Sequence, residues 1–471
     1  MESLVEENAR LRQEVAELKF ANERLEFRVQ ELERRVEGLL RALEEAQRAG
    51  KRQAAPFSRH EPKAHPAKPG RKAGAGYGCR SRRPIPATIE QTLEAELPGC
   101  WAHCGGDLEE TRIEKQYQTE IPQPKVERIE FRIHVGRCKR CGERVQGRHP
   151  RQTSDAVGGA AAQLGARAVA LATELNKGLG LSHGKTAAVL ETAFGLQVSR
   201  GGLAQAFQRV ARKAEPNYEK LVQQIRGSPS VTPDETGWKV GGRLWWMWAF
   251  SSDKLTVYSI QPGRGYEQAS AILGDDFDGF LVRDGWAVYR RFTQAGHQTC
   301  VAHLLRRCRE MMEVARPGEA KLARTVKEIL QASLKLRDRR DRNQVGEQGL
   351  AIARGKLEAR LDRTLSRNYR SPANRRLANH LQRERDAMFT FLYCPGLDAT
   401  NYRAEQAIRP LVVTRKVWGG NRTERGAHSQ SVLVSILQTC RQQLRPATAF
   451  LQQLVHLPKP QALELTPTTP R

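Results

Sequence analysis

The chain has 471 residues, enough for two or three domains, and 39% of them are hydrophobic, so at least one segment can build a sizeable core. Its formal net charge of +26 at pH 7 suits a polyanionic partner, because lysine and arginine gain affinity for phosphates through counterion release. No apolar run approaches the roughly 20 residues that span a bilayer, and no signal peptide opens the chain, so we expect an intracellular protein without a membrane segment. Its nine cysteines are then metal ligands or buried thiols rather than disulfides. A ribosome-associated or merely basic protein is the alternative that charge leaves open.

Residues 1–47 are predicted to form a coiled-coil dimerisation helix. Leucine recurs every seven residues, and the partner positions hold valine or asparagine: Leu4, Leu11, Leu18, Leu25, Leu32 and Leu39, with Asn8, Val15, Asn22, Val29 and Val36. Leucine at one core position and β-branched residues at the other favour a two-stranded coiled coil, in which a buried asparagine fixes register. The alternative is a lone amphipathic helix that packs on its own chain. The pattern predicts a homodimer or higher oligomer.

Residues 48–90 are basic and poor in large apolar side chains, which predicts a flexible linker. Residues 91–152 resemble a zinc ribbon. Two cysteine pairs, each followed by glycine, supply four thiolates for a tetrahedral structural Zn²⁺: Cys100 and Cys104, then Cys138 and Cys141. His103 is an alternative ligand to Cys104, since three residues rather than two separate the first pair. The alternating stretch from Glu120 to Val135 predicts strands between the pairs.

Residues 153–228 are rich in alanine and leucine at helical spacing and include a candidate helix-turn-helix. One helix is predicted over Ser182–Phe194 and a second over Ser199–Arg212, with Ser199 as the N-cap. The second helix of such a motif enters the major groove of DNA. Its candidates for DNA contact are Arg200, Gln205, Gln208 and Arg209. A plain helical bundle is the alternative.

From Ser230 the pattern changes to alternating apolar residues broken by short turns. The predicted order is three strands joined in part by the Gly241–Gly242 hairpin, then a helix and two further strands: Val231–Val240, Arg243–Ser251, Leu255–Ile260, Tyr266–Leu273, Phe280–Arg283 and His297–Val301. This is the order of a ribonuclease H-like fold. We therefore expect a multidomain protein whose α/β catalytic core spans 229–425, with an all-helical insertion at about 309–388. A helical tail over 426–471 is expected to include an amphipathic helix pair at 429–454.

Three acidic residues are candidates for one site. Asp234 lies on the first strand, Asp284 ends the fourth, and Glu405 lies in a later predicted helix. Their acidic rivals are Glu235 for the first, Asp275, Asp276 and Asp278 for the second, and Asp398 for the third. Three close carboxylates would repel one another without cations, and their hard oxygen atoms suit Mg²⁺ or Mn²⁺. Two such ions would make a phosphoryl-transfer site.

The motifs of the second half of the chain occur in one order. They are Asp-Glu-Thr at 234–236, Arg-Asp-Gly-Trp at 283–286, Cys-Val-Ala-His-Leu-Leu-Arg-Arg at 300–307, Ala-Glu at 404–405, Arg-Pro at 409–410, Arg-Lys at 415–416 and Gly-Ala at 426–427. In this order the chain resembles the transposases of the insertion sequence 66 family over nearly its whole length. The resemblance implies a DNA transposase that binds element ends and catalyses metal-dependent cleavage and 3′-hydroxyl strand transfer. Its Asp-Asp-Glu triad falls on Asp234, Asp284 and Glu405. The chain departs from the family at Tyr402, usually Asn, and at Gln406, usually Arg.

Further residues are expected around this triad. His303 would support the catalytic centre by a hydrogen bond, and Arg409, Arg415 and Lys416 would hold DNA phosphates. The implied partners are the terminal inverted repeats, target DNA, a second copy and accessory proteins of the same element, in the bacterial cytoplasm at the nucleoid. One alternative is a catalytically degenerate DNA-binding dimer that regulates the element. Another is a ribonuclease or structure-specific nuclease on the same fold, which would rarely need a zipper and a zinc ribbon.

Overall fold

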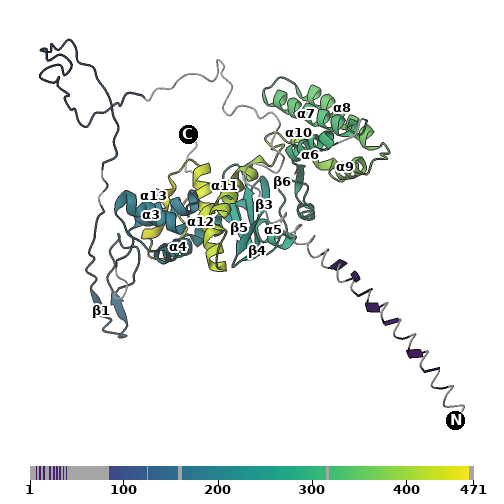
Figure 1. Ribbon diagram of the computed structural model, residues 1–471, viewed down its shortest axis with the longest axis horizontal. Helices are drawn as coiled ribbons and strands as arrows, with labels where there is room; N and C mark the ends of the chain where they lie inside the picture. Colours follow the sequence, from purple (N-terminus) through teal and green to yellow (C-terminus); the bar gives the residue numbers. More distant parts are fainter. Residues whose placement is uncertain are drawn as a thin grey trace. The chain divides into compact units, whose positions relative to one another are not determined.

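The computed structural model describes residues 84–122, 124, 126–157, 162–314 and 318–465, together with positions 7, 10, 11, 14, 15, 18, 21, 22, 25, 26, 28, 29, 31, 32, 35, 36 and 39. The chain divides into two units, Met1–Glu120 and Ile121–Arg471 (Figure 1). None of the helices within these described ranges is long and apolar enough to cross a membrane.

The first unit holds the predicted zipper. Its described positions between 7 and 39 are α-helical, which confirms the helix. Leucines of the heptad are more than half exposed: Leu11, Leu18, Leu25, Leu32 and Leu39. The partner helix that would cover them stays a prediction. Leu4, Asn8 and the linker as far as residue 83 lie outside the described residues, and residues 84–120 form neither helix nor strand.

A small antiparallel hairpin flanks the second cysteine pair in the second unit. Its strands are β1 (Val135–Arg137) and β2 (Arg144–Gln146). The prediction of strands over Glu120–Val135 was wrong, because only Val135 among the described residues of that stretch belongs to a strand. The stretch is mostly exposed. A strand needs a neighbour for its backbone hydrogen bonds, and alternation alone does not provide one.

The helical segment consists of α2 (Ala166–Thr173), a π-helical turn η1 (Glu174–Gly178), α3 (His183–Phe194) and α4 (Arg200–Arg226). The predicted N-cap Ser199 is confirmed, since its side chain accepts a hydrogen bond from the Gly202 amide. Ser182 caps α3 in the same way, by accepting from the Lys185 amide. However, α4 continues to Arg226 instead of ending at Arg212. Its buried residues recur at helical spacing as far as Ile225, so the apolar stripe never stops.

The central sheet has five strands: β3 (Ser230–Val240), β4 (Arg243–Ser251), β5 (Thr256–Gln261), β6 (Phe280–Arg283) and β7 (Gly296–Thr299). Their order is β5-β4-β3-β6-β7, with β3 to β5 antiparallel and with β6 parallel to both β3 and β7. The helix α5 (Tyr266–Leu273) and the short 3-10 helix η2 (Ala287–Arg291) connect the later strands. All five strands were predicted to within a few residues. The mixed sheet is consistent with a ribonuclease H-like core.

Helices from the end of the chain cover this sheet. α11 (Tyr402–Trp418) packs on β3 and β4, and α12 (Glu424–Gln442) packs on β5 and α4, while α13 (Ala447–His456) packs on α2 (Figure 1). Three hydroxyls on α12 accept hydrogen bonds from backbone amides of β5: Ser431 from Ile260 (3.0 Å), Ser435 from Tyr258 (2.8 Å) and Thr439 from Thr256 (3.2 Å). Because β5 is an edge strand, these bonds occupy amides that would otherwise lack a partner.

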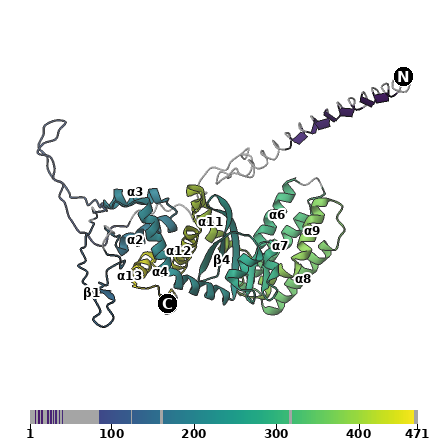
Figure 2. The same ribbon diagram turned by 90° about the horizontal axis from the view of Figure 1, so that it is seen from below.

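The helices between Asp284 and Glu405 form a group with its own core, called here the insertion. They are α6 (Val301–Val314), α7 (Lys321–Asp341), α8 (Glu347–Leu365), α9 (Pro372–Arg383), the 3-10 turn η3 (Arg385–Ala387) and α10 (Thr390–Tyr393). Leu330, Leu361 and Leu377 are fully buried in this core, and Val282 of β6 belongs to it as well. Figure 2 shows α6 to α9 packed together beside the sheet. The insertion is therefore joined to the strand that ends at Asp284.

Candidate active site

The two aspartates of the predicted triad lie side by side on parallel strands. Asp234 lies within β3, and Asp284 follows the last residue of β6. β3 pairs with β6 through Ser230 opposite Phe280 and Val231 opposite Leu281. This register, continued along both strands, brings Asp234 level with Asp284. The carboxylate of Asp284 is oriented by a hydrogen bond of 2.9 Å from the backbone amide of Trp286.

Glu405 lies in the first turn of α11, and the packing of that helix on the sheet brings it to the aspartates. Ala407, Ile408 and Leu411 bury the helix face against the sheet. Arg415, at the other end of α11, donates to Thr236 Oγ1 (3.0 Å) and to the carbonyl oxygen of Gly237, both on β3. The strand of Asp234 and the helix of Glu405 are thus joined by a charged side chain as well as by apolar contacts.

The electrostatics of the site relate Asp234 to the other two acids. The pKa of Asp234 is raised to about 7, first by burial, then by the charge of Glu235 and, less strongly, by those of Asp284 and Glu405. A like charge nearby disfavours ionisation, so both Asp284 and Glu405 lie within electrostatic reach of Asp234. Asp234 and Asp284 form no ion pair with a lysine or arginine in the described part of the chain.

Glu235, the alternative to Asp234 as a metal ligand, has both carboxylate oxygens engaged by other side chains. Its side chain is 2% exposed and accepts hydrogen bonds from Arg264 Nε (2.8 Å) and from the Tyr289 hydroxyl (2.5 Å). The guanidinium of Arg264 lies over the rings of Trp246 and Trp286, at 4.7 and 4.0 Å from their centres. Such a carboxylate has its charge compensated and its oxygen atoms engaged. This supports Asp234 as the ligating acid of the pair.

The rivals of the other two acids are also engaged or distant. Asp275, Asp276 and Asp278 are exposed residues of the turn after α5. Asp398 forms an ion pair with Arg403. Neither group is among the charges that act on Asp234.

The donor chemistry of the acid cluster fits a hard divalent cation. Three carboxylates supply oxygen ligands and a charge that Mg²⁺ or Mn²⁺ would neutralise. Among the described residues no three His, Cys, Asp or Glu side chains are gathered closely enough to form a metal-binding group. The charges of Asp284 and Glu405 therefore act on the pKa of Asp234, although the three side chains are not gathered around a single point.

His303 lies on α6 beside Glu405. Its Nε2 is 3.6 Å from Glu405 Oε1, slightly beyond a hydrogen bond, and Arg306 Nη2 is 4.0 Å from the same oxygen. The other ring nitrogen, Nδ1, is buried without a hydrogen-bond partner. His303 therefore lies where its predicted supporting role requires, but its hydrogen bond to Glu405 is not formed in this structure.

A cavity of about 360 Å³ lies at the start of α11. Its lining is Ala302, Asp398, Thr400, Asn401, Tyr402, Arg403, Glu405 and Gln406. Tyr402 and Gln406 both line it, and the Gln406 amide donates to the Tyr402 hydroxyl. These two residues thus shape the space in front of Glu405.

Each predicted cysteine pair forms a tight turn that ends in a glycine of positive φ. In the second, the Gly142 amide donates to the Cys138 carbonyl (2.8 Å), with φ +74° at Gly142. The pKa of Cys138 is lowered first by hydrogen bonding to the Cys141 backbone and then to that of Arg140. Two amides directed at one sulfur favour its thiolate, the form that binds metal. The pairs fall in different units of the chain, and a zinc ion that joins them stays a prediction.

The residues predicted to contact DNA have different surroundings. Arg200, Arg209 and Arg409 are exposed. Arg415 is half-buried and bonded to β3 as described above, and Lys416 is partly buried. Arg415 therefore joins α11, which carries Glu405, to β3, which carries Asp234, independently of any contact with DNA.

A second group of basic side chains was not singled out from the sequence. Arg376, His380 and Arg383 lie four and three residues apart on one face of α9, and Arg307 lies on α6. Burial and then the charges of Arg376 and Arg383 lower the pKa of Arg307. In the described ranges no carboxylate forms an ion pair with these three arginines. We call this group the basic face of the insertion. His380 packs on Gly285, since a Cβ added there would lie 2.8 Å from His380 Cε1, so the face lies next to Asp284.

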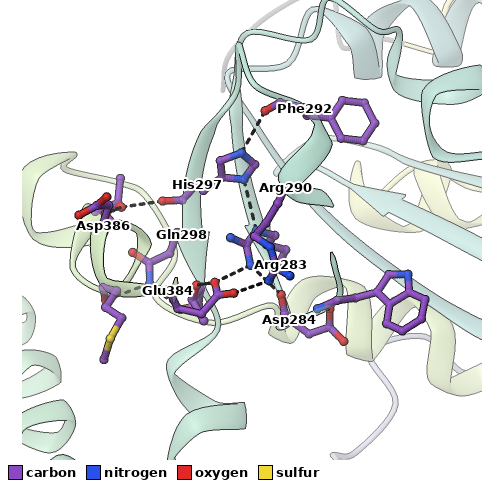
Figure 3. A network of polar contacts seen from close by, with 12 residues as sticks. Arg283, Asp284, Arg290, Phe292, His297, Gln298, Glu384 and Asp386 are labelled. Atoms are coloured by element: carbon purple, nitrogen blue, oxygen red, sulfur yellow. Dashed lines mark hydrogen bonds and ion pairs between the residues drawn. The ribbon is translucent and has the colours of Figure 1, made fainter. Parts of the chain in front are cut away.

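The sequence also did not indicate Glu384 and its partners, which lie directly beside Asp284 (Figure 3). Arg283 Nη1 is 2.7 Å from Glu384 Oε2, and both side chains are at most 2% exposed. A charged residue at the end of the apolar strand Phe280–Arg283 was the available signal for a buried partner. No pattern in the sequence around Glu384 indicates that it is buried or paired.

Comparisons with known proteins found a family and a relative that are similar to this chain. The model of a family described as "Transposase IS66 family" matches residues 161–429, a range that includes all three acids and the whole insertion. A relative in Sinorhizobium fredii, the "Uncharacterized protein y4qI", is 22% identical over 278 residues. The match covers 52% of this chain and 51% of that protein, so the chain spans about half the length of this curated relative.

Proposed function

Because the chain belongs to the IS66 family of transposases, we propose that it is a metal-dependent enzyme that cuts DNA at the ends of its element. It then joins the freed 3′-hydroxyls to target DNA. The observation that carries this proposal is the strand register that brings Asp234 level with Asp284, together with the charges of Asp284 and Glu405 that act on Asp234.

Asp234, Asp284 and Glu405 would hold the divalent ions. When bound, a pair of such ions activates the attacking oxygen and stabilises the leaving oxygen of an in-line displacement at phosphorus. The protein's own groups orient these acids. The Trp286 amide fixes the Asp284 carboxylate, and Arg415 fixes α11 on β3. His303 is close enough to hydrogen-bond Glu405 after a small movement.

DNA would be held by arginines that have no carboxylate partner. The basic face of the insertion supplies Arg307, Arg376 and Arg383 next to Asp284, and Arg409 is exposed on α11. Each such contact gains affinity by releasing counterions from the phosphate backbone, independently of base sequence. Arg200 and Arg209 of α4 would contact the terminal repeats.

The remaining parts of the proposal concern assembly. The exposed heptad leucines between Leu11 and Leu39 would pair with a second copy of the chain, and the cysteine pairs would hold a structural Zn²⁺. We place the enzyme at the bacterial nucleoid, with accessory proteins of the same element as further partners.

The test is cleavage and joining of DNA that carries the terminal inverted repeats, with Mg²⁺ present. Asp234→Ala and Asp284→Asn should each abolish both reactions while DNA binding is retained. Asp278→Asn is the matched control, because it removes an exposed rival carboxylate from the turn before β6 and should leave both reactions unchanged. Undiminished strand transfer by Asp234→Ala would contradict the catalytic role.

Tyr402 and Gln406, which line the cavity in front of Glu405, suggest a second function, because the resemblance to the family implies Asn and Arg at these positions. A catalytically degenerate chain would bind the repeats as a dimer and regulate its element. In that case the wild-type protein would bind the repeats in a mobility-shift assay but neither cut nor join them with Mg²⁺ or Mn²⁺.

A further inference from the structure

Glu384 is a buried carboxylate at the end of α9. It is 0% exposed, and both of its oxygens are engaged: Oε2 by Arg283 Nη1 (2.7 Å) and the Thr299 hydroxyl (2.6 Å), and Oε1 by Arg290 Nη1 (2.7 Å). Burial alone would raise the pKa of Glu384, but the Thr299 hydrogen bond and the charge of Arg283 outweigh it and lower the pKa. Glu384 is therefore ionised and bound on every side by groups of the catalytic core.

The partners of Glu384 lie on both sides of Asp284 in the chain. Arg283 directly precedes Asp284 and also donates from Nη1 to the Asp284 carbonyl oxygen (3.1 Å). Arg290 lies on η2, directly beyond the turn that orients the Asp284 carboxylate. One carboxylate of the insertion thus holds the loop of Asp284 at its beginning and at its end (Figure 3).

Further contacts join the insertion to β7 beside this loop. The Thr390 hydroxyl donates to the His297 carbonyl (2.6 Å), and the Phe391 amide donates to Gln298 Oε1 (2.9 Å). Arg283 Nε in turn lies 3.3 Å from His297 Nδ1. The position of the Asp284 loop and the docking of the insertion on β6 and β7 are therefore fixed by the same network.

We propose that Glu384 is a positioning residue of the transposase: by holding Arg283 and Arg290 it fixes the loop of Asp284, so that divalent-metal affinity at the acid cluster depends on a docked insertion. This inference rests on the proposed function. Glu384 does not touch metal or DNA and acts only through the two arginines. Groups that orient metal ligands from outside typically change metal affinity or activity by about 10- to 100-fold when they are removed.

The experiment compares metal binding and catalysis in matched variants of the full chain. Glu384→Gln keeps the shape of the side chain, but it removes the charge and replaces one of the two acceptor oxygens with a donor NH2 group. Mn²⁺ binding is measured by calorimetry without DNA, and the half-saturating Mg²⁺ concentration is measured in the cleavage assay. We expect the Mn²⁺ dissociation constant and the half-saturating Mg²⁺ concentration each to rise by about 10-fold. The affinity for repeat DNA should stay unchanged because Glu384 is buried.

Glu358→Gln is the control for the loss of an ion pair within the insertion. Glu358 accepts from the Tyr393 hydroxyl (2.6 Å) and lies 3.9 Å from Arg385, and neither partner belongs to the Asp284 loop. Its Mn²⁺ affinity should equal that of the wild type. Equal Mn²⁺ affinity of wild type, Glu384→Gln and Glu358→Gln would overturn the positioning role, as would an equal loss in both variants.

Arg290→Gln covers the case in which Glu384→Gln does not fold. Arg290 is one-third exposed, and its loss leaves the buried Arg283–Glu384 pair intact. The Mn²⁺ affinity of Arg290→Gln should fall, as expected for Glu384→Gln. An unchanged Mn²⁺ affinity would overturn the inference. Failure of the wild type to cleave repeat DNA would contradict the proposed function instead, whereas the Mn²⁺ comparison would still decide the role of Glu384.

Discussion

Lys177 offers a quantitative test of how the helical segment is attached to the catalytic core. The side chain is buried in the π-helical turn η1, donates to Gln430 Oε1 of α12 (2.7 Å), and lies over the rings of Phe207 and Trp418. No carboxylate forms an ion pair with it in the described part of the chain. Burial lowers the pKa of Lys177 from its ordinary value of 10.5 to about 7.

The direction of the pH effect follows from proton counting. Between pH 7 and 10.5 the unfolded chain binds a proton at Lys177 that the folded chain has released, so the free energy of unfolding rises with pH in this window. A tenfold change in proton affinity corresponds to about 1.4 kcal/mol. The buried lysine therefore costs the folded state on the order of 4 kcal/mol at pH 7 and about 2 kcal/mol at pH 9.

The assay is urea unfolding of wild type and Lys177→Met at pH 7 and pH 9. Methionine replaces the apolar stem of the lysine as far as Cε and lacks the ammonium. Its loss of the Gln430 hydrogen bond costs the same at both pH values, so the pH dependence isolates the charge. The wild type should gain about 2 kcal/mol relative to the variant from pH 7 to pH 9. Lys185→Met, at an exposed position of α3, is the control. An identical difference between wild type and Lys177→Met at the two pH values would refute this account of Lys177.

Three further predictions concern the basic face, the cysteines and α11. Arg376→Gln combined with Arg383→Gln should weaken DNA binding and lower the slope of log affinity against log salt by about two, whereas Arg375→Gln on the same helix should lower that slope by no more than half as much. Purified wild type should contain zinc by elemental analysis and Cys138→Ser should not; a zinc-free wild type would contradict the ribbon. Arg415→Met should lower the free energy of unfolding by about 1–3 kcal/mol, because two acceptors on β3 lose their donor. Unaltered thermal unfolding would exclude that role for Arg415.

The sequence determined those features that a short stretch of chain encodes by itself. The strands β3 to β7 follow from alternation and turn residues, and the starts of α3 and α4 follow from the caps Ser182 and Ser199. Two of the three acids, Asp234 and Asp284, could be predicted for the same reason, because the strands that precede or contain them fix their positions. Local patterns failed where a neighbour was needed, as in the exposed stretch Glu120–Val135, which alternates but has no partner strand over most of its length.

Tertiary structure alone decided which distant polar groups meet. Glu384 and Arg283 are 101 residues apart, and Lys177 and Gln430 are 253 residues apart. Periodicity predicts which side of a helix or strand is buried, but it does not specify which other surface covers that side. A buried charge is stable only when the covering surface brings its partner. The folded chain therefore fixes the residues that support Asp284, while the sequence indicates Asp284 itself.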